Sequence, residues 1–551
     1  MVSAQQTSSD DKDYYKFPKD IKSVAVIGGG PSGIPALRHL VDAGFDVRLF
    51  ERQSAPGGTW TWSPESPLPT TFPTPPPSTG DFVPRRPPAG EDIIGISSTQ
   101  PIVSVKQDEG RKERREFAPP NPVYWNLTNN VPTPAMAFKD FPWPENSDWY
   151  RSHEDIALYI RRYADHFNLN QYASYDTRVE NVTKLKQEDA KWRLTLRKLE
   201  SLGGDEIRET FWTEDFDAVV VASGHYGAPF IPALEGQNEW AQQWPESIIH
   251  SRAYRRPETY RDQTVLLVGT GTSGVDIGRD LDRHVKKIYQ VTRDTVVGPE
   301  DYLQFREKQK ALLPENGEIV PEIKRFLPPP PGVVISQGRI ELTDGRVLSG
   351  IDAVIFSTGY QYSFPFLSEF HRDLGTAQTS EHQSPSSVLI TNGAGIHNVY
   401  RDVFYIPDPT LTFLGLSINT PTFSFFEFQS IAITRVFQRH ARLPGLEERK
   451  REYIDRLTER GGIKWVHLLG ARHPEYVRET VEWLNDEAKH FGAQPVKGYN
   501  QTQLELGPKL QAGILKKYEL GTEGANQYIR DLIAKEKEEG TPSLAPQVSV
   551  V

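Results

Sequence analysis

The sequence of 551 residues contains no cysteine. This absence excludes disulfides, thiolate metal sites, cysteine nucleophiles and dithiol redox relays, so any redox chemistry must come from a bound cofactor. Positive charge is not in excess either, because 63 Lys and Arg residues stand against 73 Asp and Glu residues. The formal charge of −10 argues against a nucleic-acid partner.

Long hydrophobic runs are also missing. The most apolar windows, 264–268 and 411–418, have the length of strands, whereas a membrane helix needs roughly 20 apolar residues. The beginning of the chain is polar and acidic, without the basic start and apolar stretch of a secretory signal. We therefore expect a soluble, cytoplasmic protein without a membrane partner. Its length predicts two to four domains at about 150 residues each.

The chain does contain a pattern of strand, turn, helix and strand that occurs twice. In the first copy, strands at 23–27 and 46–50 flank a helix that starts at a glycine-rich turn. This turn consists of Gly28, Gly29, Gly30, Pro31, Ser32 and Gly33. In the second copy, the turn contains Gly269, Gly271, Thr272, Ser273 and Gly274. Each pattern predicts a βαβ unit that binds a dinucleotide, with the pyrophosphate at the helix N-terminus.

The residue after the second strand of each unit distinguishes two kinds of dinucleotide. Glu51 follows that strand in the first unit, where a carboxylate can accept hydrogen bonds from ribose hydroxyls. The equivalent position in the second unit is Thr292, followed by Arg293, whose guanidinium can bind a 2′-phosphate. Asp294 argues mildly against this assignment, and a solvated surface charge is the alternative for Arg293. These patterns predict FAD in the first unit and NADPH in the second.

We expect an α/β fold with two Rossmann-like dinucleotide-binding domains, the NADP domain being inserted in a discontinuous FAD domain. The expected parts are 1–226 for the beginning of the FAD domain, 227–344 for the NADP domain, and 345–551 for the rest of the FAD domain, which ends in a helical region. Residues 63–120 are rich in Pro, Ser, Thr and charge, which predicts an irregular surface insertion. Because no cysteine pair is available, electrons must leave the flavin for oxygen or a small molecule.

Short motifs accompany the two units along the chain. They are Gly57-Gly58-Thr59-Trp60, residues 126–144, residues 222–226, residues 356–360, residues 404–416, and Trp244-x-Glu246-x-x-x-His250-x-x-x-Tyr254. In this order they resemble the motifs of flavin-containing monooxygenases, although Trp and Glu replace the Phe and Gly of the family's F-x-G-x-x-x-H-x-x-x-[FY] pattern. Related Baeyer–Villiger enzymes end that pattern with Trp, whereas this chain has Tyr254-Arg255. The resemblance therefore favours the branch that oxygenates nitrogen and sulfur.

The resemblance implies a mechanism and a set of site residues. NADPH would reduce FAD, and oxygen would add at flavin C4a to give a hydroperoxide that hydroxylates an amine, thiol or thioether. Asn130 would be the catalytic side chain beside the flavin or the retained nucleotide, the alternative being a turn residue before Pro132. The other residues implied to contact FAD are Gly58, Thr59, Trp60, Asn129 (in place of the family's Thr) and Val179. Those implied to line the NADP site are Ser273, Gly274, Val275 and Asp276.

Three alternatives stay open at this point. The chain could be a Baeyer–Villiger enzyme that oxygenates a ketone, an NADPH oxidase that releases hydrogen peroxide, or a non-catalytic sensor of redox state. We interpret His250 as a structural residue of the inter-domain linker, and we assign no metal site. The sequence leaves open the substrate and whether the protein forms a homodimer.

Overall fold

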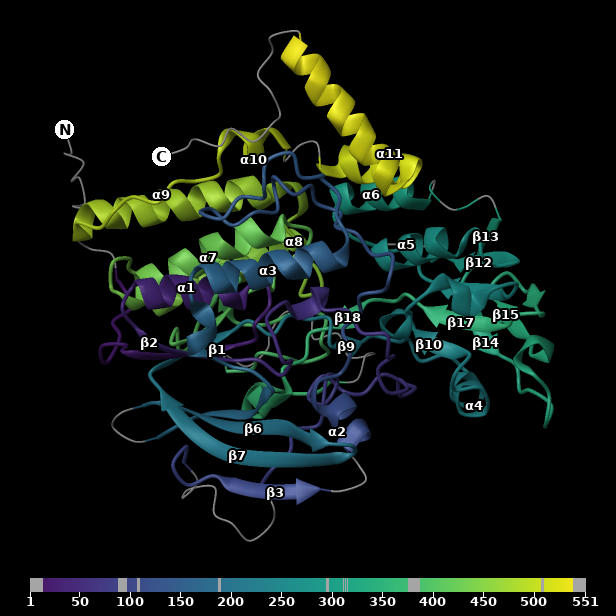
Figure 1. Cartoon of the computed structure of the whole chain (residues 1–551), viewed down its shortest axis with the longest axis horizontal. Coiled ribbons are helices and arrows are strands. Elements are labelled where there is room, and N and C mark those ends of the chain that lie inside the picture. Colours follow the sequence, from purple (N-terminus) through teal and green to yellow (C-terminus); the bar gives the residue numbers. More distant parts are fainter. Residues whose placement is uncertain are drawn as a thin grey trace, which may run out of the picture.

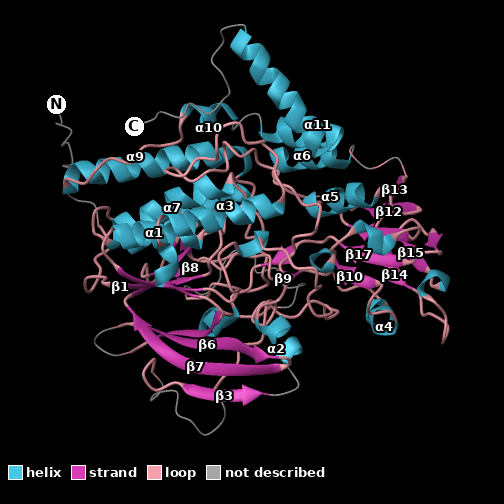
Figure 2. Cartoon of the chain, viewed as in Figure 1, coloured by secondary structure: helices cyan, strands magenta, loops and turns pink. Residues whose placement is uncertain are grey.

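The structure is a computed structural model of the chain, and it describes residues 13–87, 97–106, 110–186, 190–293, 297–310, 312, 314, 316–374, 387–506 and 510–538. Two sheets lie side by side, the first parallel except at its edge formed by residues 399–413 and the second parallel throughout, and an antiparallel sheet lies below the first (Figure 1, Figure 2). Among the described helices, none is long and apolar enough to cross a membrane.

The first sheet contains strands from both ends of the chain, in the order β19-β20-β21-β8-β1-β2-β4. Its strands are β1 (Ser23–Ile27), β2 (Asp46–Phe50), β4 (Ala173–Ser174), β8 (Ala218–Val221), β19 (Val399–Tyr400), β20 (Phe404–Tyr405) and β21 (Leu411–Phe413). β1 pairs in parallel with β2 and β8, and β8 pairs in parallel with β21. The predicted βαβ unit around the first glycine turn is therefore present, and a later part of the chain extends its sheet.

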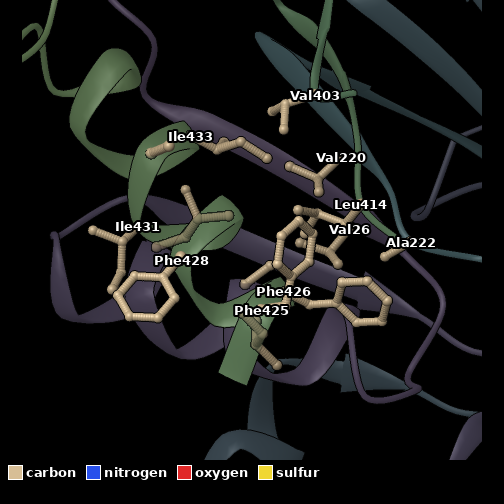
Figure 3. Packing of buried hydrophobic residues seen from close by; sticks show 14 of the residues in the cluster. Val26, Val220, Ala222, Val403, Leu414, Phe425, Phe426, Phe428, Ile431 and Ile433 are labelled. Carbon is tan, nitrogen blue, oxygen red and sulfur yellow. The ribbon is translucent and has the colours of Figure 1, made fainter. Parts of the chain in front are cut away.

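Alternate residues of β1 face two different layers, as strand geometry requires. Val24 and Val26 belong to the core beneath the helices α1 (Gly33–Asp42), α3 (His153–His166) and α7 (Thr422–Phe437). Ala25 and Ile27 belong to the core that contains the antiparallel sheet. Figure 3 shows Val26 and Val220 packed with phenylalanines of α7. The first sheet is thus buried on both faces, which is typical of a parallel sheet.

The antiparallel sheet includes part of the segment that we expected to be irregular. Its strands, in the order β3-β7-β6-β5, are β3 (Ile102–Lys106), β7 (Glu206–Phe216), β6 (Trp192–Gly203) and β5 (Thr177–Lys184). β3 and the following helix α2 (Gly110–Phe117) both fall within 63–120, so the expectation of an irregular loop is wrong for them. The buried guanidinium of Arg197 on β6 pairs with Glu209 of the neighbouring strand β7 and with Glu113 of α2, and the second pair holds the helix against the sheet.

The second sheet is parallel throughout, in the order β10-β17-β11-β12-β13. Its strands are β10 (Ile248–His250), β11 (Thr264–Val268), β12 (Lys287–Val291), β13 (Gly317–Val320) and β17 (Ala353–Phe356). The helices of this unit are α4 (Gln237–Gln243), α5 (Thr272–Leu281) and α6 (Glu300–Lys310). Because β17 pairs with both β10 and β11, this unit continues past residue 344, where we had expected it to end. The boundary was misplaced because an antiparallel sheet of β14 (Ile323–Phe326), β15 (Ile340–Leu342) and β16 (Val347–Leu348) precedes β17.

Two further connections join the units. β9 (Ala228–Pro229) and β18 (Tyr360–Gln361) form a small antiparallel ladder where the chain leaves one sheet and where it leaves the other. The C-terminal part is helical, as predicted, with α8 (Leu446–Arg460), α9 (His473–Phe491), α10 (Gln501–Leu506) and α11 (Leu510–Glu538). α11 bends at Gly521, which has a φ of +73°; it begins beside α6 and then projects from the body (Figure 1).

The buried pair of Arg197 and Glu113 gives a test of how the segment 63–120 is held. Exchange of Glu113 for Gln removes one carboxylate from a buried guanidinium, so we expect the free energy of unfolding to fall by about 1–3 kcal/mol. Glu116→Gln on the same helix is the matched control, because its ion pair with Arg85 is partly exposed and contributes little. Thermal melting of both variants measures the difference. Equal melting temperatures would show that the buried pair does not hold α2.

Candidate active site

The first glycine turn packs so closely against its neighbours that no β-carbon fits at either end. At Gly28, which has a φ of +108°, a β-carbon would lie 2.5 Å from the carbonyl oxygen of Ala222. At Gly33 it would lie 1.9 Å from the carbonyl oxygen of Gly28. The backbone ladder of α1 begins at Ile34, whose N–H donates to Gly30 at 3.1 Å. The preceding N–H groups thus lie at an open helix N-terminus, which fits a pyrophosphate.

Glu51 lies beside this turn at the end of β2, and its side chain is buried. One carboxylate oxygen accepts the N–H of Gly29 at 2.6 Å, and the other accepts the N–H of Gln53 at 2.7 Å. Burial raises the pKa of Glu51, while these two N–H donors and the charge of Arg52 act in the opposite direction. The carboxylate is therefore fixed next to the turn, where ribose hydroxyls of a dinucleotide would lie.

The Gly57-Gly58-Thr59-Trp60 segment closes over the first turn. Gly57 donates its N–H to Gly29 at 3.1 Å, and a β-carbon on Gly58 would lie 2.7 Å from the α-carbon of Gly30. A 3₁₀ turn over Gly58–Trp60 brings Thr59 and Trp60 to this place. Asn121 supports the turn by donating to the carbonyl oxygen of Gly58 at 2.9 Å. Gly30 is thus confined by the chain itself as well as by any bound pyrophosphate.

Val179 lies on the Glu51 side of the first unit. It is buried in β5, and Thr177, two residues earlier in that strand, donates its N–H to the carbonyl oxygen of Glu51 at 2.9 Å. This position agrees with a backbone contact to adenine, which stays a prediction.

The second glycine turn repeats the packing of the first. A β-carbon on Gly269 (φ +110°) would lie 2.6 Å from the carbonyl oxygen of Ser357, and one on Gly274 would lie 2.2 Å from that of Gly269. Gly271 differs, because its φ is −77° and no atom of the described residues lies within 4 Å of where its β-carbon would be. Neither the backbone nor a neighbour demands glycine there. The open space at the N-terminus of α5 fits a phosphate group.

The other residues predicted for the second turn differ from one another in their surroundings. Thr272 and Ser273 lie in the first turn of α5 at its open end. Val275 is buried, so its side chain belongs to the core of the unit and only its backbone faces the turn. Asp276 lies on α5 near Lys517 and Tyr518, since its charge affects the pKa of both groups.

Arg293 follows β12 and is exposed at the carboxyl edge of the second sheet. Two cations that the sequence did not single out lie near it, Arg306 of α6 and Lys464. The pKa of Lys464 is lowered by burial and by the positive charges of Arg293 and Arg306. Such a cluster suits a phosphate dianion. No spacing in the sequence connects Lys464 with Arg293, because they come together only through packing; Asp294 lies outside the described residues.

Asn129 and Asn130 lie in a loop between the two units, and they have different surroundings. The side-chain amide of Asn129 donates to Val131 O at 2.6 Å and to Trp149 O at 2.9 Å, and its oxygen accepts the N–H of Arg151 at 2.5 Å. It is fully buried. The expectation of a cofactor contact is therefore wrong for the Asn129 side chain, because these bonds use it to build the loop. Asn130 is only partly buried.

Residues on either side of Asn130 show that its loop joins the two units. Leu127 packs with the core of the second unit, whereas Val131 packs with that of the first. Asn126 donates to a carboxylate oxygen of Asp280 on α5 at 2.7 Å. The loop therefore passes between the two dinucleotide units, where a side chain can reach either nucleotide.

His250 is a structural residue in this fold. Its Nδ1 accepts the N–H of Arg252 at 3.1 Å, so its Nε2 carries the proton and donates to the carbonyl oxygen of Gly359 at 3.0 Å. Burial lowers the pKa of His250 to about 3, and the ring is neutral at physiological pH. The histidine thus ties β10 to the turn after β17, as we expected for a linker residue.

His225 and its neighbours mark where the carboxyl ends of the two sheets meet. His225 follows β8 of the first sheet, and its Nδ1 lies 3.1 Å from the carbonyl oxygen of Gly415. Its Nε2 is enclosed and has no partner among the described residues, and burial lowers the pKa of His225 to about 4. Tyr226 contacts the ring of Tyr360, which follows β17 of the second sheet, at 5.3 Å between centroids. The sequence motif included these residues but did not indicate that they meet.

Gly271 offers the sharpest test of the second turn. A Gly271→Val side chain would meet only open space in the protein but would fill the place expected for the nucleotide phosphate. We expect unchanged melting and flavin content, with the KM for NADPH raised about tenfold or more.

Gly498→Val is the matched control for this variant, because Gly498 has no positive φ and its nearest neighbour lies 4.0 Å from the β-carbon position. Steady-state kinetics should be altered only by the Gly271 change. Wild-type kinetics in both variants would show that the nucleotide phosphate does not bind at this turn.

Comparison with known proteins supports two dinucleotide-binding units in this chain. A family model for flavin-binding monooxygenase-like proteins matches residues 114–297, and one for an NAD(P)-binding Rossmann-like domain matches residues 26–72. The solved structure of S-allyl-L-cysteine S-oxygenase from Allium sativum has a TM-score of 0.61 at 21% identity, covering 94% of this chain and 98% of that one. It has the same fold.

Two relatives are similar over nearly their whole length. Flavin-containing monooxygenase iboF of Amanita muscaria is 36% identical over 499 residues, which cover 88% of this chain and 91% of the relative. Flavin-containing monooxygenase ustF2 of Aspergillus flavus is 33% identical over 496 residues, which cover 89% of this chain and 97% of the relative. This chain therefore belongs to the flavin-containing monooxygenase family and is an enzyme that uses FAD and NADPH.

Proposed function

We propose that this enzyme uses NADPH and molecular oxygen to hydroxylate a nitrogen or sulfur atom of a small nucleophile. The observation that carries the proposal is that the carboxyl ends of the parallel strands of two sheets, each with an open glycine turn, meet at His225, Tyr226 and Tyr360. Ligands of α/β sheets bind at such edges. Tyr254-Arg255, in place of the Baeyer–Villiger pattern, supports nitrogen or sulfur as the acceptor, and the likeness to the Allium sativum S-oxygenase is compatible with sulfur.

The chain's own residues have binding and orienting roles in this proposal. The turn from Gly28 to Gly33 holds the FAD pyrophosphate, and Glu51 accepts hydrogen bonds from the adenosine ribose. The turn at Gly271 holds the NADPH pyrophosphate, and Arg293 binds the 2′-phosphate together with Arg306 and Lys464. FAD, when bound, supplies the chemistry by accepting electrons from NADPH and activating oxygen for transfer to the nucleophile.

No acid or base pair is needed at the reacting centre, because the oxidant formed with the cofactor is itself electrophilic. The protein has to exclude water and orient hydrogen-bond donors. Asn130 is the side chain that we assign to this task, because it lies in the loop between the units and its amide can both donate and accept.

Incubation of the holoenzyme with NADPH, oxygen and a panel of amines, thioethers and cyclic ketones tests the acceptor. We expect a product heavier by one oxygen from an amine or a thioether, formed in proportion to the NADPH consumed. The Gly271→Val variant serves as the control with impaired reduction. Oxygenated ketones alone would assign the enzyme to Baeyer–Villiger chemistry, and peroxide equal to the NADPH consumed without any product would make it an oxidase.

Arg293→Ala tests the 2′-phosphate assignment. Loss of the guanidinium should raise the KM for NADPH about tenfold, the effect of one charge-assisted hydrogen-bonded pair, and leave the KM for NADH nearly unchanged. Arg283→Ala, which removes an exposed arginine just beyond the C-terminal end of α5, is the matched control and should change neither value. An equal effect of Arg293→Ala on NADPH and NADH would exclude Arg293 from the phosphate site.

A further inference from the structure

A buried lysine from the C-terminal helix lies against the loop that carries Asn130. Lys517 of α11 places its ammonium 2.8 Å from the side-chain oxygen of Asn130, 3.2 Å from the carbonyl oxygen of Asn129 and 3.4 Å from that of Thr128. These three oxygens are acceptors, one for each proton of the ammonium group. Lys517 is only 8% exposed although it lies almost four hundred residues further along the chain.

The environment of Lys517 shows that its charge is specifically accommodated. Burial lowers the pKa of Lys517, and the carboxylate of Asp276 on α5 opposes that effect. A buried ammonium that lacked partners would cost several kcal/mol, so the three oxygens and the nearby carboxylate are what allow a cation at this place. Asp276 belongs to the second unit and Asn130 to the loop between the units, so Lys517 lies at their junction.

The lysine decides which way the Asn130 amide faces. Because an ammonium group can only donate, the amide must turn its oxygen toward Lys517 and its nitrogen away from it. Among the described residues, the side-chain bond of Asn130 is the one its oxygen accepts from Lys517, and its amide nitrogen donates to none of them. Without the lysine, no described hydrogen bond would fix which end of the amide faces this side of the loop.

We infer that Lys517 is a positioning residue, which holds the oxygen of the Asn130 amide so that its nitrogen is offered as a donor to the bound nucleotides. The inference rests on the proposed role of Asn130. It gives the C-terminal helix a part in the active site, because α11 supplies a group that neither dinucleotide unit contains.

Other contacts of α11 show that the helix can stay docked without Lys517. Asn526 accepts the N–H of Tyr150 at 3.0 Å and donates to the carbonyl oxygen of Tyr150 at 2.9 Å. Arg530 pairs with Asp148 at 2.5 Å. These contacts lie on the same helix but do not involve Asn130, and they supply control variants for loosened docking.

Three single variants and one double variant test the inference on the FAD-loaded enzyme. They are Lys517→Met, Asn130→Ala, Asn526→Ala and the Lys517→Met, Asn130→Ala pair. The readouts are the dissociation constant of NADP⁺ and the rate of peroxide release with NADPH in air and no added substrate. We expect Lys517→Met and Asn130→Ala each to raise the dissociation constant of NADP⁺ and the rate of peroxide release by about tenfold. This is the size of one hydrogen bond to a charged donor. The double variant should be no worse than Asn130→Ala alone.

The controls separate positioning from packing. Asn526→Ala should lower the melting temperature and leave both readouts unchanged. Lys517→Arg retains a donor-only cation, so its readouts should lie between those of the wild type and of Lys517→Met. If Lys517→Met is too unstable to purify, Lys517→Gln is used in the same cycle. Effects of Lys517 and Asn130 that add independently would overturn the inference, because the lysine would then act only through the loop carbonyls.

Failure of the inference and failure of the proposed site give different results. If the readouts change in Asn130→Ala but stay normal in Lys517→Met, the positioning role of Lys517 is overturned and the role of Asn130 stays intact. Normal readouts in Asn130→Ala would overturn both, since a lysine cannot act through a residue that contributes nothing.

Discussion

At both nucleotide turns a backbone oxygen occupies the place that a β-carbon would take, and the site depends on this close packing. Gly28 and Gly33 bring the start of α1 against β1 and β8, while Gly269 and Gly274 bring α5 against β11 and β17. Each helix N-terminus is thereby held at the carboxyl edge of its sheet with its N–H groups open. The two edges then meet across the ladder of β9 and β18.

The proposed function requires no group of catalytic side chains of the hydrolase or protease kind. In that function the cofactors would supply the electrons and activate the oxygen, and the protein would contribute position, a fixed hydrogen-bonding environment and protection from water. The histidines agree with this view. His250 is neutral and both of its ring nitrogens are bonded to the backbone, whereas His225 leaves one nitrogen enclosed near the junction of the sheets.

The sequence was sufficient for features that depend on neighbours along the chain. The two glycine turns, the carboxylate of Glu51 and the exposed guanidinium of Arg293 lie where strand and helix periodicity place them. Features that depend on distant parts of the chain could not be predicted. β17 joins the second sheet although the antiparallel sheet of β14, β15 and β16 precedes it in the chain. β3 and α2 form regular structure within a proline-rich segment, and Lys464 comes near Arg293 only through packing.

Asn129 and Asn130 show the same limit at the scale of one loop. Motif resemblance placed both amides beside the cofactors, yet the side chain of Asn129 makes three hydrogen bonds to the backbone and that of Asn130 accepts a hydrogen bond from Lys517 of the C-terminal helix. Which of two adjacent amides is available to a ligand is decided by their hydrogen-bond partners, and one of those partners comes from the far end of the chain.

The proposed function requires that the two nucleotides face each other between the sheets, so that electrons pass from NADPH to FAD. Anaerobic mixing of the FAD-loaded enzyme with NADPH, followed by its absorbance at about 450 nm where oxidised flavins absorb, tests it most directly. If the nucleotides face each other, this band bleaches and returns when oxygen is admitted. A band that stays undiminished in fully loaded enzyme would contradict it.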